Sequence, residues 1–378
     1  MAIRTDLFLV GFLRGLVALG AAGPLVMAAA QQQVIGPTAA PAPAPVPAPA
    51  PAPAASPFVT GPGKAPSPFV TGPTKGAEPS GPERSINEWL SRIHDASRQR
   101  SYVGTFVVSS GGGALSSARI WHTLHGERQL ERIETLTGLP RQSFRRDDEV
   151  LTFIPESRVV RVERRESLGG LFPDLPKSNE TAIADFYAAR RLGSDRVAGF
   201  EADIVQLAPK DNLRFGYRLW SEKQSGLVIK VQTIGIDGQV LEQAAFSELQ
   251  LDANLRADKL ARMMGVPDGW RVEKAEAVKT TPQAEGWVMR EAVNGFKPLS
   301  CYKRPAEGVM QWIFSDGLAS VSLFVEAYDR RRHVHEGLFV LGATHTLTRR
   351  IQDWWLTAVG EVPVYTLRTF TLNLERRK

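Results

Sequence analysis

The segment at residues 213–231 constrains the fold more than any other part of this sequence. It reads LRFGYRLWSEKQSGLVIKV, and every second residue in each half is apolar. Such alternation is typical of β-strands that bury one face. The polar run between the halves, 221–226, ends in glycine, as a hairpin loop requires. The segment predicts a sheet with an apolar face and has no obvious nucleophile, metal ligand or phosphate loop nearby. Binding is therefore favoured over catalysis.

The N-terminus has the pattern of an export signal. Arg4 and Arg14 accompany an apolar run at 15–27, which ends in the small residues 28–30. This order is typical of a secretory signal peptide with its cleavage site, predicted at residues 1–30. An uncleaved anchor is the alternative, although the run is shorter than the roughly 20 residues that span a bilayer. In either case the rest of the chain is predicted to lie outside the cytoplasm.

Residues 31–83 have the composition of an extended linker. Proline and alanine alternate at 41–54, which indicates a semi-rigid spacer. An imperfect repeat follows, with SPFVTGPGKAP at 56–66 and SPFVTGPTKGA at 67–77. The repeat is either duplicated linker or a tandem docking motif that presents Phe58 and Phe69 to a partner.

Composition favours two globular domains after this linker. The chain has 378 residues, of which 43% are hydrophobic, enough for two packed cores. Its one cysteine, Cys301, cannot form an internal disulfide and is expected to be buried, with a reactive thiol as the alternative. Lys and Arg number 46 against 40 Asp and Glu. Outside the cytoplasm, this basic balance fits anionic lipid, polysaccharide or an acidic protein segment better than nucleic acid.

The first domain is predicted at residues 84–252. A helix is expected at 85–98, because Ser85 and Glu88 form a capping box ahead of the apolar stripe Trp89, Leu90 and Ile93. A second helix is expected at 178–192, burying Ile183, Phe186 and Tyr187. Closely spaced strands with no intervening helix indicate an antiparallel meander. Besides the hairpin, these are expected at 102–108, 118–124, 129–136, 142–146, 150–154, 159–163, 202–207 and 240–249.

The strand pattern breaks near Asp252, and a short helix is expected at 257–264. We therefore predict an interdomain connection at 253–267 and a second, smaller domain at 268–378. Its strands are expected at 270–278, 287–291, 298–302, 310–315, 320–326, 338–341, 344–348, 354–359 and 366–374. The fold class is thus α+β, a large antiparallel sheet with packed helices followed by a mostly β domain.

Several motifs carry a resemblance to a known family. In the first domain these are Trp89-Leu90, YVGTFV at 102–107, RVAG at 196–199 and FGYRLW at 215–220. In the second they are DGLASVS at 316–322 and GEVP at 360–363. In this order they resemble the MucB/RseB regulators of the sigma-E envelope-stress pathway.

The resemblance implies a periplasmic protein whose large domain is an open half-barrel similar to the lipoprotein carriers LolA and LolB. Members of the family bind the periplasmic part of a transmembrane anti-sigma factor and shield it from the first regulatory protease. Lipid or lipopolysaccharide is implied as the ligand that releases it. The chain departs from the family pattern in its long Pro/Ala linker and in Trp354-Trp355 ahead of GEVP.

A lipid site needs a wall of apolar side chains and cations at its rim. Candidates for the wall are Tyr102, Phe106, Phe144, Phe153, Tyr217 and Leu219. Ordinary sheet core is their alternative role. Candidates for an anionic ligand come from the densest basic cluster and are Arg141, Arg145, Arg146 and Arg161. A solvated strand face is the alternative for these arginines.

Partner binding by the second domain, as the resemblance implies, suggests that Asp316, Gly317 and Leu318 form an exposed loop. Because Asp-Gly is also a common hairpin corner, a turn chosen for its geometry is the alternative. The sequence leaves a homo-oligomer open.

Enzymatic functions find little support. The sequence has no serine-hydrolase elbow, zinc-protease helix, P-loop or dinucleotide fingerprint. His122 with His125, or His333 with His335, are close enough to suggest a metal, but no Cys or carboxylate with ligand spacing accompanies them. We therefore predict no metal and no cofactor. The hypothesis is a non-enzymatic periplasmic regulator. A lipid or lipoprotein carrier is the alternative, and an exported hydrolase is a third class.

Overall fold

The structure is a computed structural model, which describes residues 84–126, 128–164, 180–274 and 276–377. The predicted export signal, the linker and its repeat lie outside the described residues. Within them, most of the chain forms one large and one smaller antiparallel sheet. This confirms the predicted class, a large sheet with a few helices followed by a smaller, mostly β domain.

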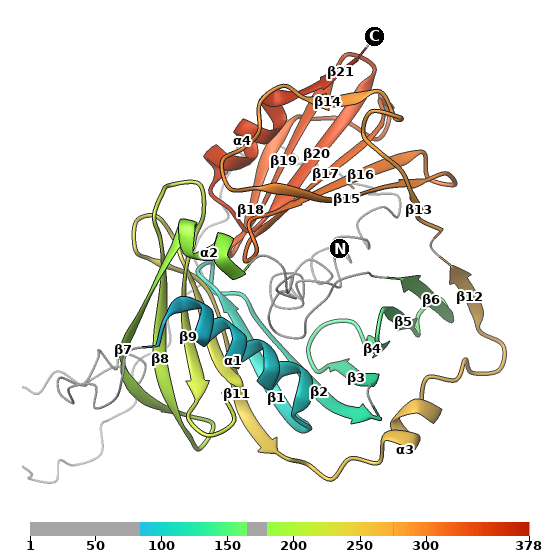
Figure 1. Cartoon of the computed structure of the whole chain (residues 1–378). Coiled ribbons are helices and arrows are strands. Elements are labelled where there is room, and N and C mark those ends of the chain that lie inside the picture. The colour runs from blue at the N-terminus through green and yellow to red at the C-terminus, as the bar shows by residue number, and fades with distance from the viewer. Residues whose placement is uncertain (1–83, 127, 165–179, 275, 378) are drawn as a thin grey trace, which may run out of the picture. The chain divides into compact units, whose positions relative to one another are not determined.

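The first sheet has 12 strands within the described residues, in the order β12-β6-β5-β4-β3-β2-β1-β11-β10-β9-β8-β7. Figure 1 shows it curving around helix α1. Most neighbouring strands follow each other closely in sequence and pair antiparallel, as the closely spaced strand signals predicted. The exceptions are β1 with β11, which are distant in sequence, and β12 with β6, which are distant in sequence and parallel. The strands are β1 (Tyr102–Ser110), β2 (Leu115–His125), β3 (Arg128–Thr135), β4 (Gln142–Arg146), β5 (Glu149–Ile154), β6 (Val159–Arg164), β7 (Tyr187–Val197), β8 (Phe200–Pro209), β9 (Gly216–Glu222), β10 (Val228–Ile234), β11 (Val240–Leu251) and β12 (Arg271–Lys274).

Helix α1 (Ile86–Gln99) forms as predicted. The Ser85 side chain accepts from the Glu88 backbone N–H, and the Glu88 carboxylate accepts from the Ser85 N–H, so both halves of the capping box are present. Its buried stripe, Trp89, Leu90 and Ile93, packs on the sheet. The helix therefore covers part of one sheet face.

The hairpin of β9 and β10 is confirmed, with the predicted loop between its arms. Leu219 lies opposite Val231, and Tyr217 lies opposite Thr233. A bulge between Val228 and Lys230 shifts the register near the loop. An extra residue in one strand turns the following side chains to a new direction. In the second arm, Leu227 and Ile229 lie in one core cluster, Val228 lies in the neighbouring cluster, and Val231 packs against both.

The helix predicted at 178–192 is too long. Helix α2 spans only Glu180–Phe186, and Tyr187 begins β7, which pairs with β8 along its length. Alanines in this stretch favour a helix by local propensity. Pairing with β8 along the length of the strand overrides that local preference.

Helix α3 (Ala257–Arg262) forms where a short helix was predicted. The strand expected at 270–278 in the second domain is wrong in its placement. Its first part is β12, which pairs in parallel with β6 and so extends the first sheet. Its last part is the short β13 (Val278–Lys279), which joins the second sheet.

The second sheet has seven strands within the described residues, in the order β13-β15-β16-β17-β20-β19-β18. A separate two-stranded ladder joins β14 to β21. Besides β13, the strands are β14 (Trp287–Met289), β15 (Lys297–Arg304), β16 (Val309–Ser315), β17 (Ser320–Ala327), β18 (Gly337–Leu341), β19 (Thr344–Ile351), β20 (Trp354–Gly360) and β21 (Leu374–Arg376).

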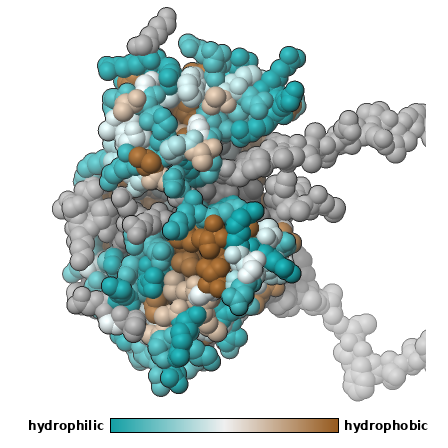
Figure 2. All heavy atoms as spheres, turned by 90° about the vertical axis from the view of Figure 1, so that its right-hand side faces the viewer, coloured by the Kyte–Doolittle hydropathy of each residue, from teal (hydrophilic) through white to brown (hydrophobic). Residues whose placement is uncertain are grey.

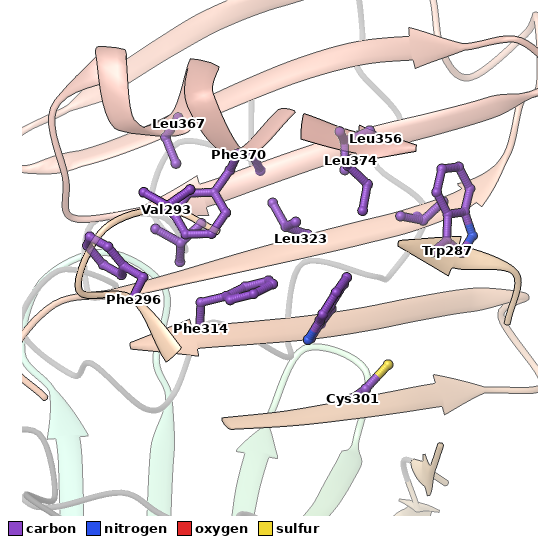
Figure 3. Close-up of a cluster of buried hydrophobic side chains, with 14 of the residues drawn as sticks. Trp287, Val293, Phe296, Cys301, Phe314, Leu323, Leu356, Leu367, Phe370 and Leu374 are labelled. Carbon is purple, nitrogen blue, oxygen red and sulfur yellow. The ribbon is translucent and has the colours of Figure 1, made fainter. Parts of the chain in front are cut away.

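The strand predicted at 366–374 is wrong, because this segment forms helix α4 (Val364–Asn373). Threonines favoured a strand by local propensity. However, Leu367, Phe370 and Leu374 recur at helical spacing and are fully buried in the second core. Figure 3 shows Leu367 and Phe370 pointing from α4 toward the sheet that carries Phe314 and Leu323. Burial of these apolar side chains therefore outweighs the strand propensity of the threonines, and the segment is helical.

Figure 2 faces the side on which β6 and β12 lie in Figure 1 and shows mostly polar side chains around one compact apolar area. Large apolar side chains of the described residues are mostly buried in four clusters. Within the described part of the chain, no helix combines the length and apolar character needed to cross a bilayer.

Candidate functional site: a sheet face and a domain junction

The large sheet has two faces, which we name after the helices that cover them. Residues directly opposite each other in paired strands point to the same face. The α1 face contains the row Leu219, Val231, Ala244 and Val108, which crosses β9, β10, β11 and β1. Leu219 packs there with Trp89 of α1. The α3 face is the opposite one, where α3 lies against β2 and β3 and its Leu260 packs in the cluster of Leu130, Phe144 and Phe153.

The structure brings four of the six candidate wall residues to the α1 face. On β1, Tyr102, Phe106 and Val108 are separated by even numbers of residues, so their side chains point to the same face. On β9, Tyr217 lies two residues before Leu219 and shares its face. Tyr102 and Phe106 belong to one core cluster, and Tyr217 and Leu219 belong to the neighbouring one. All four are buried. Their role as a lipid wall stays a prediction.

The other two wall candidates, Phe144 and Phe153, lie on the α3 face. On β3, Ile133 pairs with Ile120 of the α1 face, whereas its neighbour Arg132 pairs with Phe144. Phe144 and Phe153 contact each other edge to face and pack with Leu260 of α3. Sequence reasoning missed this division, because the two faces are distinguished only by the register between distant strands.

The α1 face changes from apolar to basic across the sheet. The row from Ile120 and Ile133 continues into Ser143, Thr152 and Arg161 on β4, β5 and β6. A parallel row leads from His122 and Glu131 to Arg145. Arg145 and Arg161 therefore share the face that carries Tyr102 and Phe106.

Each of the four arginine candidates has a protein contact. Arg145 Nε donates to the Asp147 carbonyl at 2.9 Å, and Arg161 lies 3.9 Å from Glu273 of β12. Arg146 pairs with Glu149 at 2.9 Å on the α3 face, and Arg141 pairs with Glu156 outside the strands. The predicted basic cluster is thus split, with two members on the α1 face.

A buried polar row crosses the α1 face at β1, β2 and β3. Tyr102 stacks on His122 at 5.0 Å between ring centroids, and His122 lies opposite Glu131. His122 Nδ1 donates to the Arg100 carbonyl at 2.8 Å. Burial lowers the pKa of His122 from its usual 6.5, and Glu131 opposes this shift. The imidazole is therefore held neutral, with its proton on Nδ1.

The second part of the candidate site is a buried ion pair between the two sheet domains. Arg214 precedes β9, and Asp316 follows β16. Arg214 Nη1 lies 3.3 Å from Asp316 Oδ2, and both side chains are 0% exposed. Tyr187 Oη donates to the same Asp316 oxygen at 3.1 Å. The other oxygen accepts the backbone N–H groups of Leu318 and Ala319 at 2.8 and 2.7 Å. Burial raises the pKa of Asp316, and Arg214 opposes that shift.

Aromatic rings and a backbone carbonyl complete the surroundings of Arg214. Its guanidinium carbon lies 4.4 Å from the Phe186 ring centroid and 5.2 Å from that of Phe296. Arg214 Nη2 donates to the Asn294 carbonyl at 2.8 Å, and Nε lies 3.1 Å from Asp211. Sequence reasoning missed Arg214, because nothing in the local pattern of residues 213–231 indicates which distant carboxylate it meets.

Two glycines permit this close approach of the domains. A Cβ on Gly317 would lie 2.8 Å from Ile183 Cγ1, and one on Gly295 would lie 2.7 Å from Arg214 Nη2. Both glycines have positive φ, 101° and 81°, which side chains rarely adopt. The junction therefore depends on glycine at both positions.

The prediction that Asp316, Gly317 and Leu318 form an exposed loop is wrong. Asp316 and Leu318 are buried, and Leu318 belongs to the core cluster of Trp89, Ile183 and Tyr217 in the first domain. The turn is a docking point between domains, because it inserts an apolar side chain and a carboxylate into the first domain. Its role in partner binding stays a prediction.

The structure separates the side chains of His333 and His335. His333 is buried, stacks on Trp355 at 4.8 Å and has Nε2 3.4 Å from Glu326, whereas His335 is exposed. Among the described residues, no three His, Cys, Asp or Glu side chains gather as metal ligands. Cys301 is buried as predicted, and burial raises the pKa of its thiol to about 11.

The sheet face and the junction together define a two-domain, β-rich binding protein. Comparison with known families then places it. The MucB/RseB N-terminal domain matches residues 85–264, and the MucB/RseB C-terminal domain matches residues 281–375. The chain belongs to the MucB/RseB family.

Similar proteins include the sigma factor AlgU regulatory protein MucB of Pseudomonas aeruginosa, 28% identical over 322 residues, 79% of this chain and 93% of that protein. The sigma-E factor regulatory protein RseB of Haemophilus influenzae is 23% identical over 301 residues, again 79% and 93%. A crystal structure of MucB in complex with MucA(peri) has a TM-score of 0.59 and 25% identity, covering 77% of this chain and 98% of that chain.

Proposed function

We propose that this chain is an exported, non-enzymatic regulator of the sigma-E type. It binds the periplasmic part of a transmembrane anti-sigma factor and so denies a regulatory protease its substrate. The observation that carries the proposal is the likeness to MucB across both domains, because a MucB structure was solved in complex with MucA(peri). Such a partner also supports a periplasmic location, which is part of the proposal.

We further propose that lipid or lipopolysaccharide binds the α1 face and releases the partner. This is supported by the change along that face from the apolar residues near Tyr102 and Phe106 to Arg145 and Arg161. Aliphatic chains match the apolar part, and phosphates match the guanidinium groups. Because the wall residues are buried in the described structure, entry of an acyl chain requires movement of α1 or of other covering residues.

The buried junction offers a way for the two ligands to influence each other. A ligand shifts a protein between arrangements only when it binds them with different affinity. The Arg214–Asp316 pair and Leu318 hold one domain arrangement. Lipid would release the partner if it favoured an arrangement in which these contacts are broken.

A capture experiment tests the regulator. The full exported chain is immobilised and incubated with the periplasmic part of the anti-sigma factor from the same organism, with and without lipopolysaccharide. We expect capture without lipopolysaccharide and loss of capture with it. No capture under either condition would contradict the proposal.

A periplasmic carrier of lipid or lipoprotein is the second candidate, favoured by the apolar and basic composition of the α1 face. Mass spectrometry of the purified chain separates the two. A carrier without a signalling partner should co-purify with acyl chains and show no capture of the anti-sigma segment.

A further inference from the structure

Four polar side chains lie in one row across β1 to β4 on the α1 face. Tyr102 of β1 lies opposite His122 of β2. His122 lies opposite Glu131 of β3, and Glu131 lies opposite Arg145 of β4. Tyr102, His122 and Glu131 are 0%, 2% and 7% exposed, and Arg145 is half-buried. We call these four residues the Tyr102–Arg145 row. Neighbouring strands are about 4.8 Å apart, so the row spans roughly 14 Å.

Three members of the Tyr102–Arg145 row have buried polar atoms without a partner. The Tyr102 hydroxyl forms no hydrogen bond. His122 Nδ1 donates to the Arg100 carbonyl, which leaves Nε2 as an acceptor that no described residue meets. The Glu131 carboxylate forms no ion pair or hydrogen bond with any residue that the structure describes. Because buried polar groups in folded proteins nearly always have partners, these atoms indicate a ligand that supplies the missing donors.

The two charges of the row act on both rings. Burial raises the pKa of Tyr102, Glu131 raises it further, and Arg145 opposes the shift. The same two charges act in opposite directions on the pKa of His122. Directly opposite residues have Cβ atoms about 5 Å apart, yet Glu131 and Arg145 form no ion pair with each other. Arg145 uses Nε for the Asp147 carbonyl, so its two Nη groups are available to an anion.

These groups together match a ligand that carries both a cation and an anion. An ammonium group donates three hydrogen bonds, and the acceptors are Tyr102 Oη, His122 Nε2 and the Glu131 carboxylate. A phosphate matches the Arg145 guanidinium. A headgroup with a phosphate alone would bring a second negative charge beside Glu131 with no cation to compensate it. A metal ion fits less well, because no three His, Cys, Asp or Glu side chains of the described chain gather as ligands.

We propose that the Tyr102–Arg145 row selects a lipid whose headgroup joins a phosphate to a primary amine, as in phosphatidylethanolamine. The amine donates to Glu131, His122 and Tyr102, and the phosphate accepts hydrogen bonds from the arginine. An ethanolamine unit separates the two groups by only two carbon atoms, which suits residues on adjacent strands. Phe246 contacts the Tyr102 ring edge to face in an apolar cluster, so acyl chains have a matching surface beside the headgroup.

The inference rests on the proposed binding of lipid to the α1 face and adds which headgroup that face prefers. Its test compares short-chain lipids with the same acyl chains and phosphate. Dihexanoyl phosphatidylethanolamine carries a primary amine, dihexanoyl phosphatidylcholine a trimethylated amine without N–H groups, and dihexanoyl phosphatidylglycerol no amine. Glycerophosphoethanolamine, which lacks acyl chains, distinguishes a lipid from a soluble headgroup. Isothermal titration calorimetry measures binding to the full exported chain below the critical micelle concentration of each lipid.

We expect phosphatidylethanolamine to bind at least tenfold more tightly than each of the other three ligands. Glu131→Gln should abolish its advantage over phosphatidylglycerol, and Tyr102→Phe should reduce it, while neither variant lowers the affinity for phosphatidylglycerol. Glu134→Gln is the matched control, because Glu134 belongs to the same strand but lies on the opposite face, where it pairs with Arg132 at 2.8 Å. It should retain the wild-type preference. Circular dichroism verifies that each variant is folded.

Equal affinities for phosphatidylethanolamine and phosphatidylglycerol would overturn the inference and leave lipid binding to the α1 face intact. Equal affinity for phosphatidylcholine would overturn it as well, because the N–H donors would then play no part. An unchanged preference in Glu131→Gln would show that the amine is recognised elsewhere, and equal binding of glycerophosphoethanolamine would overturn the assignment to a lipid. If no lipid bound at all, this inference and the lipid part of the proposed function would both be wrong.

Discussion

From the contacts of single residues, we expect substitution of Asp316 to be especially destabilising. Its carboxylate is fully buried and is compensated by Arg214, the Tyr187 hydroxyl and two backbone N–H groups. Removing one member of a buried charge pair leaves the other uncompensated in a medium that solvates it poorly. Asp316 and Arg214 should therefore matter for stability in a way that exposed ion pairs of this chain do not.

We predict that Asp316→Ala lowers the free energy of unfolding by about 3–5 kcal/mol, because Arg214 is left buried without its partner. Urea denaturation followed by tryptophan fluorescence measures the change. Asp258→Ala is the matched control, since Asp258 forms an exposed ion pair with Arg262 and should have little effect. Equal effects of the two substitutions would show that the buried pair has no special role.

His122 predicts how stability depends on pH. Because burial lowers its pKa in the folded chain, the unfolded chain binds a proton first as the pH falls below about 7. The free energy of unfolding should therefore decrease from pH 7.5 to 5.5, by at most about 1.4 kcal/mol per pH unit for this one proton. His122→Asn, whose amide retains a donor for the Arg100 carbonyl, should reduce that slope.

Denaturation at a series of pH values measures the slope. Replacement of the exposed His335 by Gln is the control and should leave it unchanged. His345 contributes in the same direction, because burial lowers its pKa as well, so the slope should shrink in His122→Asn without vanishing. An unchanged slope in that variant would contradict the assignment of a buried, neutral His122.

Helices and strands were predicted correctly from the sequence where local propensity and tertiary packing favour the same structure. The capping box and apolar stripe fixed α1, and strict alternation with a polar loop indicated β9 and β10. Prediction failed at 187–192 and 366–374, where local propensity and tertiary packing oppose each other. The candidate site was only partly predictable, because the face of Phe144 and the partner of Arg214 depend on pairing between distant segments.

The register of β4, β5 and β6 makes a prediction about lipid binding. Arg145 and Arg161 lie on the α1 face, whereas Arg146 lies on the α3 face. If lipopolysaccharide binds the α1 face, the double variant Arg145→Gln with Arg161→Gln should bind it about tenfold or more weakly, because charge-assisted hydrogen bonds contribute roughly 1.5–3 kcal/mol. Isothermal titration calorimetry measures the affinities.

Arg146→Gln is the control for this experiment, since it removes the same charge from the adjacent residue on the opposite face. It should retain the wild-type affinity for lipopolysaccharide. Equal losses in both variants would mean that basic charge alone attracts the ligand and that the α1 face is not its site.

At the scale of the whole molecule, one buried junction joins the two domains. The first domain offers a face that changes from apolar to basic, and the second inserts Asp316 and Leu318 into the first. Thr366 of α4 adds a hydrogen bond of 2.7 Å to the Leu213 carbonyl, and Phe215 meets His345 edge to face. A ligand that alters these contacts would change both domains together. Thermodynamic coupling between two ligands then has a structural basis.

Coupling between two ligands is reciprocal, so it can be measured in both directions. The affinity of the exported chain for the periplasmic part of its anti-sigma factor is determined with and without saturating lipopolysaccharide, and the affinity for lipopolysaccharide with and without that segment. We predict that each ligand weakens binding of the other by the same factor, at least tenfold. Tight binding of both ligands with no mutual effect, or no binding of the anti-sigma segment at all, would contradict it.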